Sequence, residues 1–355
     1  PQEFVGDEAH RGDMVWSAAV PEELRSRATA VIGNFPVSQA SQYTRLEWLQ
    51  TFSAGVDAYI CPGVLPRGTM VTNASGTPAY GQSVSEHMFA TMWALMKNLN
   101  RYASNQRDHQ WQDEGPVLSP EGGIALIIGV GDIGSHFAQL AQSVGMRTFG
   151  VRRYADVPAK GIEKMYGFER LETLLPLADV VAMAVPRSPQ THHLLNADRL
   201  GRLKSTAIVI NAGRGDAIDP EALADALHNG RLHGAGLDVT EPEPLPAESP
   251  LWDEPHCLIT PHVAGGNHLE KTSEHIIRIA LTLCQTAGTV ESRAILIRLC
   301  RAAGGHRLTL NTDKGRITPL LYAPYRAIRK RWLIVSTNQY WFAPIPSNFT
   351  LKPRW

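Results

Sequence analysis

The chain has 355 residues, of which 43% are hydrophobic and 19% are charged, so it is long enough for two ordinary globular domains. Its 34 basic residues balance 34 acidic ones. This zero net charge excludes a general electrostatic attraction to nucleic acid or to a membrane surface, so an acidic substrate must be held by local groups. No apolar run is long enough to cross a bilayer.

The cysteines bear on metal binding and on compartment. Cys61, Cys257, Cys284 and Cys300 are widely spaced and form no Cys-x-x-Cys pair. This spacing argues against a disulfide framework and a zinc site, so we predict no metal and a cytoplasmic protein. The N-terminus has no signal-peptide pattern. The first residue is not methionine, so we expect the chain to begin partway into its first domain.

Short apolar runs predict β-strands between residues 30 and 260. In the first 80 residues they lie at 30–33 and 70–73, and residues 46–50 lead into a turn at 53–57. After Gly123, apolar runs alternate with helical patterns, which predicts a parallel sheet with helices on both faces. The predicted strands of this region are 124–128, 148–151, 178–185, 207–210, 235–239 and 257–260.

Two helices have clear start signals. Ser83 and Glu86 have the spacing of a capping box, which predicts that a long helix begins at Ser83. Asp219 followed by Pro220 predicts the N-terminus of a second helix. The apolar stripe of the first helix predicts a core face or a subunit contact and consists of Val84, Met88, Met92, Leu95 and Leu99.

A glycine-rich loop follows the predicted strand at 124–128 and opens a predicted helix. The motif Gly-x-Gly-x-x-Gly binds dinucleotides in this strand–loop–helix context. Its first glycine permits a tight turn, its second lets the backbone approach a pyrophosphate, and its third lets the helix pack on the strand. The alternative is a plain strand–turn–helix connection. The predicted cofactor-binding residues of the loop are Gly129, Gly131, Asp132, Ile133 and Gly134.

The end of the next predicted strand bears on the choice between NAD and NADP. An acidic residue there would bind the ribose 2′-hydroxyl, but Arg152 and Arg153 follow the strand and the next acid is Asp156. Two guanidiniums suit a 2′-phosphate, which arginine grips with paired donors. The alternative is a pair of solvated arginines. We predict NADP as the preferred cofactor and NAD as the second choice.

Three polar segments that follow predicted strands carry Arg214, Glu243 and His262. Loops at the carboxyl ends of strands in a doubly wound sheet meet at the ligand crevice, so these side chains can converge. Arginine can bind the carboxylate of a 2-oxo acid and polarise its ketone. As hydride arrives, the ketone oxygen needs a proton, and histidine can donate it while a nearby carboxylate stabilises the imidazolium.

Each of these residues also has a structural alternative. Arg214 could pair with Asp216 or Asp219. Glu243 lies in a proline-rich loop where exposed glutamates are common, and His262 could be satisfied by backbone groups. The three residues occur in order, in one predicted sheet behind a dinucleotide loop, and this combination favours a catalytic site.

These motifs resemble the D-isomer-specific 2-hydroxyacid dehydrogenase family over about residues 31–278. The resemblance implies an α/β protein in which a Rossmann-type doubly wound parallel sheet, the cofactor domain, is inserted into a smaller flavodoxin-like substrate domain. It implies NAD(P)H-dependent reduction of a 2-oxo acid to the D-2-hydroxy acid. His262 would be the acid/base, Glu243 its partner and Arg214 the substrate-binding residue. Members are typically homodimers, with the long helix at the interface.

The resemblance also implies roles for residues that no sequence motif singles out. It implies that backbone N–H groups of the turn Ala54, Gly55 and Val56 hold the substrate carboxylate, beside Arg214 and His262. No second basic cluster calls for a phosphorylated acid, so we predict a small unphosphorylated 2-oxo acid. The further cofactor-binding positions that it implies are Val84, Val185, Pro186, Thr191, Ala212, Asp238 and Gly265.

We expect four segments: an N-terminal part of the substrate domain (1–82), a dinucleotide-binding domain (83–266), a return segment (267–290) and an atypical basic tail (291–355). Relative to the family, we expect the first strand and helix to be missing and the connection at 76–81 to be slightly long. The last helix lacks its leucine-rich ending. We hypothesise that the tail arises from a frame change and does not fold as in the family.

Two other functions stay open. Some relatives of this fold are dinucleotide-sensing binding proteins or corepressors, but no peptide groove is marked here, and the complete set of Arg214, Glu243 and His262 favours an enzyme. The other is an inactive, truncated family member, which the two unusual ends suggest. Formate dehydrogenases resemble the cofactor domain but lack the glutamate partner, so Glu243 argues against that branch.

Overall fold

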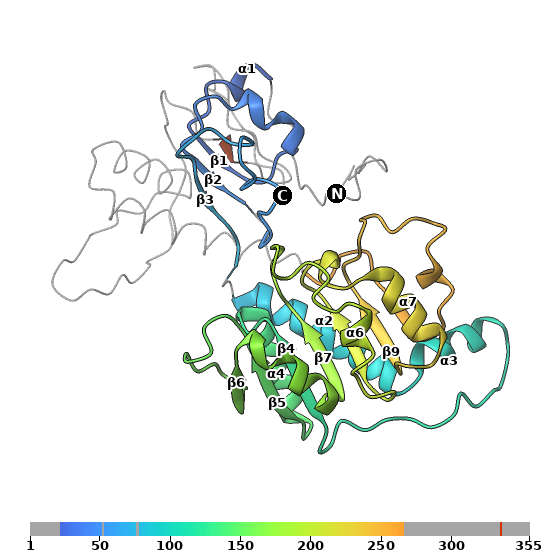
Figure 1. Cartoon of the computed structure of the whole chain (residues 1–355). Helices are drawn as coiled ribbons and strands as arrows, with labels where there is room; N and C mark the ends of the chain where they lie inside the picture. Colours follow the sequence, from blue (N-terminus) through green and yellow to red (C-terminus); the bar gives the residue numbers. More distant parts are fainter. Residues whose placement is uncertain (1–21, 52, 76–77, 266–333, 336–355) are drawn as a thin grey trace, which may run out of the picture. The chain divides into compact units, whose positions relative to one another are not determined.

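The computed structural model describes residues 22–51, 53–75, 78–265 and 334–335. These residues fall into two compact units: 75–265 form the larger, and those between 22 and 74 form the smaller together with 334–335. Each unit is built on its own parallel β-sheet (Figure 1). Among the helices of the described ranges, none has the length and apolar character needed to cross a membrane.

The smaller unit has a sheet in the order β11-β1-β2-β3, with every neighbouring pair parallel. Its core contains Phe35 and Tyr43, whose rings stack at 4.2 Å. Of the basic tail, the structure describes only β11. The prediction that the tail does not fold as in the family concerns residues outside the described ranges. The elements are α1 (Glu22–Arg25), β1 (Ala30–Ile32), η2 (Val37–Gln42), β2 (Trp48–Gln50), β3 (Met70–Thr72) and β11 (Ile334–Val335).

The larger unit has a seven-stranded parallel sheet in the order β10-β9-β8-β7-β4-β5-β6. The strand order reverses between β4 and β7, which is the topological switch point of a doubly wound fold, so the predicted Rossmann-type fold is confirmed. No apolar run predicts β6, which is an edge strand. The strands are β4 (Ile124–Ile128), β5 (Arg147–Val151), β6 (Lys164–Tyr166), β7 (Val180–Met183), β8 (Ile208–Asn211), β9 (Gly234–Leu237) and β10 (Cys257–Ile259).

Helices cover both faces of this sheet because its central strands are apolar on both sides (Figure 1). Ala125 and Ile127 of β4 join a core with α2 and α4, whereas Leu126 and Ile128 join a core with α5, α6 and α7. The helices are α2 (Pro78–Met96), α3 (Leu99–Arg107), α4 (Asp132–Ser143), α5 (Leu171–Leu174), α6 (Ala197–Leu200) and α7 (Pro220–His228). The 3₁₀ turns are η3 (Phe168–Arg170), η4 (Leu175–Leu177), η5 (Gly215–Ala217) and η6 (Pro250–Trp252).

The start predicted for the long helix is wrong. Helix α2 begins at Pro78, because proline is compatible with a first helical turn, where its missing N–H would have no partner. Ser83 lies inside the helix and donates its hydroxyl to the carbonyl of Ala264 at 3.0 Å. At the other end α2 stops at Met96, and Leu99 belongs to α3, where its side chain is 54% exposed. The other four residues of the predicted stripe are buried, so the core face is confirmed.

Candidate active site

The three predicted catalytic residues follow neighbouring strands of the larger sheet. Arg214 follows β8, Glu243 follows β9 and His262 follows β10, and these strands are adjacent in the sheet. Because the strands are parallel, the loops that carry the three side chains leave from the same edge. The glycine-rich loop, which follows β4, leaves from this edge as well.

A hydrogen bond joins His262 to Glu243. Nδ1 of His262 lies 3.0 Å from Oε2 of Glu243, and Oε1 of Glu243 accepts the N–H of Thr240 at 3.0 Å. Burial raises the pKa of Glu243, but the hydrogen bond and charge of His262, the Thr240 N–H and the charge of Arg214 together lower it below its ordinary value. Glu243 is therefore ionised near neutral pH and contacts Nδ1 of the His262 ring, not Nε2.

The lowered pKa of Glu243 predicts a stability contribution that depends on pH. Its folded-state pKa lies below the ordinary value of 4.5, so the contribution is present above about pH 4.5 and is lost as pH falls through the folded-state pKa. We therefore expect Glu243→Gln to lower the melting temperature at neutral pH, and the difference from wild type to shrink below about pH 4.5. Thermal unfolding followed by circular dichroism measures this difference, and a deficit of the same size at acidic pH would contradict it.

The loop that carries Arg214 is shaped by the side chain of Asn211. The Asn211 amide donates to the carbonyl of Arg214 at 2.8 Å, and its oxygen accepts the N–H of Gly213 at 3.0 Å. Arg214 has an extended backbone here, with φ −139° and ψ 140°. Asn211 is not among the predicted site residues, although asparagine just before a glycine-containing turn is a local signal for such bonding.

The acids near Arg214 in the sequence contact other groups. Oδ2 of Asp216 lies 2.9 Å from Nε of Arg187. The carboxylate of Asp219 accepts two N–H groups from the first turn of α7, which confirms it as the N-cap of that helix. Arg214, in contrast, lies close enough to Glu243 for its charge to lower the pKa of that carboxyl.

Asp238 is buried at the end of β9 and holds the loop that carries His262. Its carboxylate accepts the Thr260 hydroxyl at 2.7 Å and the N–H groups of the two residues after His262 at 2.9 and 3.1 Å. Nε2 of His87, from α2, lies 2.9 Å from the same hydroxyl. His262 has a φ of 52°, in the left-handed region, so this network holds an unfavourable backbone conformation in place. Thr260 and His87 are not among the predicted site residues, because they lie far apart in the sequence.

The glycine-rich loop has room for a dinucleotide. Gly129 has a φ of 97°, and a Cβ there would lie 2.5 Å from the carbonyl oxygen of Ala184. A Cβ at Gly134 would lie 2.4 Å from the carbonyl oxygen of Gly129, because α4 packs closely on the loop. A Cβ at Gly131 would meet nothing within 4 Å. This open space lies at the N-terminus of α4, whose N–H groups and partial positive charge suit a pyrophosphate. The residues present therefore fit a dinucleotide.

Replacing Gly131 with valine should separate cofactor binding from folding. The new side chain meets open space, so we expect a melting temperature close to that of wild type. It would occupy the space for the pyrophosphate, so we expect NADPH affinity to fall at least about tenfold, measured by isothermal titration calorimetry. Gly134→Ala is the matched control and should destabilise the fold by about 1–3 kcal/mol. Unchanged NADPH affinity in folded Gly131→Val would contradict the assigned site.

The loops after β7 and β8 pack against each other beside the switch point. Val185 is buried, and a Cβ at Gly213 would lie 2.7 Å from its backbone nitrogen and oxygen. Thr191 donates its hydroxyl to the carbonyl of Pro186 at 2.7 Å, which closes the turn after β7. The N–H of Ala212 donates to the last residue of β7 at 3.1 Å. These four predicted cofactor positions lie on adjacent loops.

The remaining predicted cofactor residues lie in different surroundings. Val84 is buried in the core between α2 and the sheet. A Cβ at Gly265 would lie 2.9 Å from the hydroxyl of Tyr80. Asp132 and Ile133, half-buried in the first turn of α4, stand beside Gly131.

The two arginines after β5 differ in their contacts. The guanidinium of Arg152 donates to the carbonyl of Tyr154 at 2.9 Å, to that of Val130 at 3.2 Å and to that of Val157. Arg152 thus connects the loop that follows β5 to the glycine-rich loop. Arg153 is exposed. A 2′-phosphate would therefore depend mainly on Arg153.

The turn predicted to hold a substrate carboxylate lies in the smaller unit. The carbonyl of Ala54 accepts the Asn73 amide at 2.7 Å, and the carbonyl of Gly55 accepts the Ser53 hydroxyl at 2.8 Å. Within the ranges that the structure describes, the backbone N–H groups of Gly55 and Val56 donate to no protein group. Successive N–H groups of this kind suit an anion such as a carboxylate.

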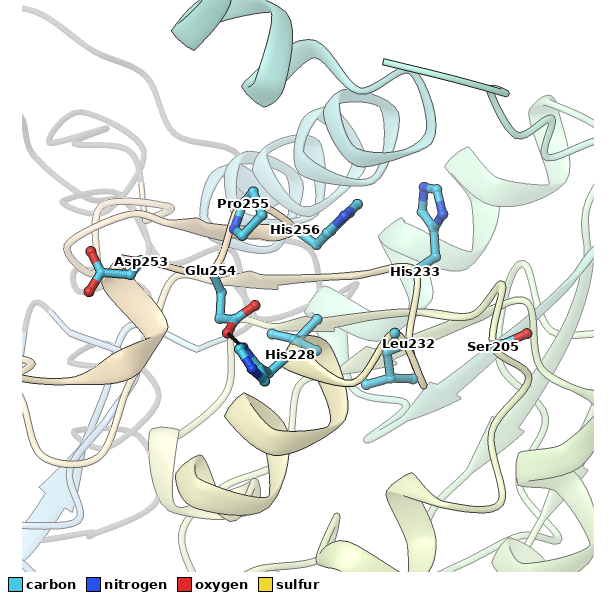
Figure 2. Close-up of a pocket in the computed structure, with 10 residues that line it drawn as sticks. Ser205, His228, Leu232, His233, Asp253, Glu254, Pro255 and His256 are labelled. Atoms are coloured by element: carbon cyan, nitrogen blue, oxygen red, sulfur yellow. Dashed lines mark hydrogen bonds and ion pairs between the residues drawn. The ribbon is translucent and has the colours of Figure 1, made fainter.

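A cavity of about 610 Å³ lies at the opposite edge of the larger sheet (Figure 2). His233 and His256, which line it, come just before β9 and β10, at the amino ends of these strands. His228 and Glu254 form an ion pair there at 3.2 Å. Burial lowers the pKa of His256, and the nearby charges of Arg101 and His233 add to this. The cavity does not include the predicted catalytic residues.

Residues 89–264 match the family profile described as D-isomer specific 2-hydroxyacid dehydrogenase, NAD binding domain. The chain is 30% identical over 261 residues to glyoxylate/hydroxypyruvate reductase B of Yersinia enterocolitica, a match that covers 71% of this chain and 78% of that protein. The predicted family resemblance thus extends to a curated relative over most of its length.

Two solved structures resemble this one. A D-isomer specific 2-hydroxyacid dehydrogenase family protein from Aeromonas salmonicida superposes with a TM-score of 0.65 at 32% identity, covering 77% of this chain and 91% of that one. A D-isomer specific 2-hydroxyacid dehydrogenase from Xanthobacter autotrophicus, solved with NADPH and MES, has a TM-score of 0.63 at 28% identity and covers 71% and 79%. Both superpositions cover most of the matched protein.

Proposed function

The chain belongs to the D-isomer-specific 2-hydroxyacid dehydrogenase family, and from this membership we propose that it reduces a small unphosphorylated 2-oxo acid, such as glyoxylate or hydroxypyruvate, to the D-2-hydroxy acid. It is an oxidoreductase that acts on the CH–OH group of 2-hydroxy acids with a nicotinamide dinucleotide. The observation that carries the proposal is the hydrogen bond between His262 and Glu243, formed beside Arg214.

The proposed roles follow from the chemistry of the side chains. Arg214 binds the substrate and polarises its ketone oxygen. The reduced nicotinamide, when bound, supplies the hydride that reaches the ketone carbon. Negative charge then develops on the ketone oxygen, and Nε2 of His262 donates the proton that completes the hydroxyl. Glu243 orients the ring and stabilises its protonated form before the transfer.

We propose NADP as the preferred cofactor, with NAD as the second choice. The support is the exposed Arg153, the absence of an acid before Asp156 and the NADPH found in the Xanthobacter autotrophicus relative. We expect Arg153→Ala to weaken NADPH binding about tenfold or more, since hydrogen bonds to a charged group contribute about 1.5–3 kcal/mol. NADH binding should not change. Fluorescence titrations with both cofactors test this, and an equal loss for both would point to a structural role for Arg153.

We also propose that the chain forms a homodimer in the cytoplasm. Leu99, Trp111 and Val117, in and after α3, have side chains that are at least half exposed, and such apolar groups are typical of subunit contacts. The free thiols of Cys61 and Cys257 suit a reducing compartment. Analytical ultracentrifugation of the full chain distinguishes a dimer from a monomer.

The experiment that tests the proposed activity follows the loss of nicotinamide absorbance in the full chain. NADPH and NADH are each combined with glyoxylate, hydroxypyruvate, pyruvate and a branched 2-oxo acid. We expect turnover with at least one acid and faster turnover with NADPH. Cofactor binding without turnover of any acid would favour a dinucleotide-sensing protein instead. Failure to bind either cofactor would favour an inactive family member.

A further inference from the structure

We propose that His192, His193 and Glu241 bind a divalent transition-metal ion of the Zn²⁺ type. One ring nitrogen of each histidine and a carboxylate oxygen of Glu241 lie within 4.8 Å of one another. Two imidazoles and one carboxylate are a known type of ligand set for Zn²⁺, with water in the remaining position. The cysteine spacing predicted no metal, but these ligands come from segments far apart in the sequence, which only the fold brings together.

The spacing of His193 and Glu241 matches two ligands of one ion. Nε2 of His193 lies 3.6 Å from Oε2 of Glu241, which is too long for a hydrogen bond. Two ligands each about 2.05 Å from a shared tetrahedral ion are about 3.3 Å apart, so a small movement would place an ion between these atoms. The Glu241 side chain is 34% exposed, which leaves a path for the ion.

The ring of His192 completes the set. It stacks on the ring of His193 at 4.0 Å between centroids, with 24° between the planes. Its side chain is 56% exposed, so the ring can turn about its own bonds without disturbing the core. The backbone N–H of His193 donates to the carbonyl of Asp216 at 2.7 Å, and this bond anchors the segment that carries both histidines.

Each histidine has an aspartate near its Nδ1. Nδ1 of His192 lies 3.9 Å from Oδ2 of Asp216, and Nδ1 of His193 lies 3.9 Å from Oδ2 of Asp219. Metal-binding histidines usually direct their second nitrogen to a carboxylate, which orients the ring and makes the first nitrogen a better ligand. This arrangement leaves Nε2 of His193, which faces Glu241, for the ion.

The local charge also favours a cation. Asp216, Asp219 and Glu241 supply three negative charges and Arg187 supplies one positive charge, so the group has a net charge of −2 when both histidines are neutral. Arg187 lies 2.9 Å from Oδ2 of Asp216 and 3.7 Å from Oε1 of Glu241. The guanidinium therefore faces one carboxylate oxygen of Glu241, Oε1, and His193 faces the other, Oε2. Oδ1 of Asp216 is buried and accepts no hydrogen bond within the described residues, so the negative charge there is not fully compensated.

Metal binding would join two loops at the edge of the sheet that carries the catalytic residues. His192 and His193 follow β7, and Glu241 follows β9 and precedes Glu243 by two residues. A ligand that binds only the folded state raises its stability, so Zn²⁺ should raise the melting temperature of the full chain. This readout requires no turnover, so it is independent of the proposed reductase activity.

The test is a calorimetric titration of Zn²⁺ into the full chain after treatment with a chelator. Cys61→Ser serves as the background, because Cys61 is an exposed thiol. His192→Phe keeps the ring stack but removes a ligand, and Glu241→Gln keeps the side-chain shape but removes the charge. His228→Phe is the matched control. His228 also pairs with a glutamate, Glu254, but at the opposite edge of the sheet (Figure 2). Near-ultraviolet circular dichroism verifies that every variant is folded.

We expect one Zn²⁺ per chain, with affinity reduced about tenfold or more in His192→Phe and in Glu241→Gln and unchanged in His228→Phe. Excess Mg²⁺ should not compete, because it prefers oxygen ligands. Wild-type affinity in both ligand variants would overturn the proposal, as would the absence of Zn²⁺ binding. A cobalt–thiolate absorption band on replacing Zn²⁺ with Co²⁺ would also overturn it, because it would assign the ion to cysteine.

Discussion

His262→Ala is expected to lower kcat for 2-oxo acid reduction by about 10²- to 10⁴-fold, the usual contribution of a positioned general acid. The variant has no group to protonate the ketone oxygen as hydride arrives. NADPH affinity should stay close to wild type, because the glycine-rich loop follows β4 and not β10. Steady-state kinetics and calorimetric titration of NADPH measure the two quantities separately.

Two controls make the result for His262 specific. Glu243→Gln should lose less activity, since it leaves the imidazole in place and removes only the negative charge beside Nδ1. His256→Ala removes a histidine at the opposite edge of the sheet and should retain wild-type kcat. If His262→Ala and His256→Ala had similar kcat values, His262 could not be the proton donor.

Arg214→Ala is expected to lower kcat/KM by about 10²- to 10³-fold, because the variant loses the positive charge that stabilises the developing charge on the ketone oxygen. Arg214→Lys should recover only part of this loss, since an ammonium lacks the planar pair of donors that matches a carboxylate. Initial rates at varied 2-oxo acid concentration measure kcat and KM for both variants. NADPH affinity serves as the control and should be unchanged.

The same variants also test a structural role for Arg214. The charge of Arg214 lowers the pKa of Glu243. Removing Arg214 therefore changes the electrostatic surroundings of the hydrogen bond between Glu243 and His262. If Arg214→Ala lowered the melting temperature without changing kcat/KM, the arginine would support the loop and would not bind substrate. A combined loss of kcat and increase of KM would match contact with both the ground state and the transition state.

Local patterns predicted the cofactor unit well, because the elements of a buried parallel sheet are encoded in short stretches. The run at 124–128 coincides with β4, and Asp219 caps α7 as its side-chain chemistry requires. Apolar residues on both sides of each strand indicated helices on both faces, and the two cores confirm this. An edge strand such as β6 escapes this logic, since it needs no apolar run.

The capping box at Ser83 shows where local pattern fails. Serine and glutamate three residues apart stabilise a helix start only where the preceding residue leaves the helix. Here the helix continues back to Pro78, and the Ser83 hydroxyl finds an acceptor in Ala264, from a loop 181 residues away in the sequence. No window of sequence around Ser83 contains that acceptor.

The sequence by itself determined the fold class, the position of the glycine-rich loop and the candidacy of Arg214, Glu243 and His262, because each depends on a residue type next to a strand end. Only the tertiary structure decided which groups surround these residues. Asp238, Thr260 and His87 hold the loop of His262 through contacts between β9, β10 and α2. The ligand set of His192, His193 and Glu241 likewise exists only where loops from β7 and β9 meet. The physical reason is that polar contacts act over a few ångströms in space, and parallel strands bring distant parts of the sequence within that range.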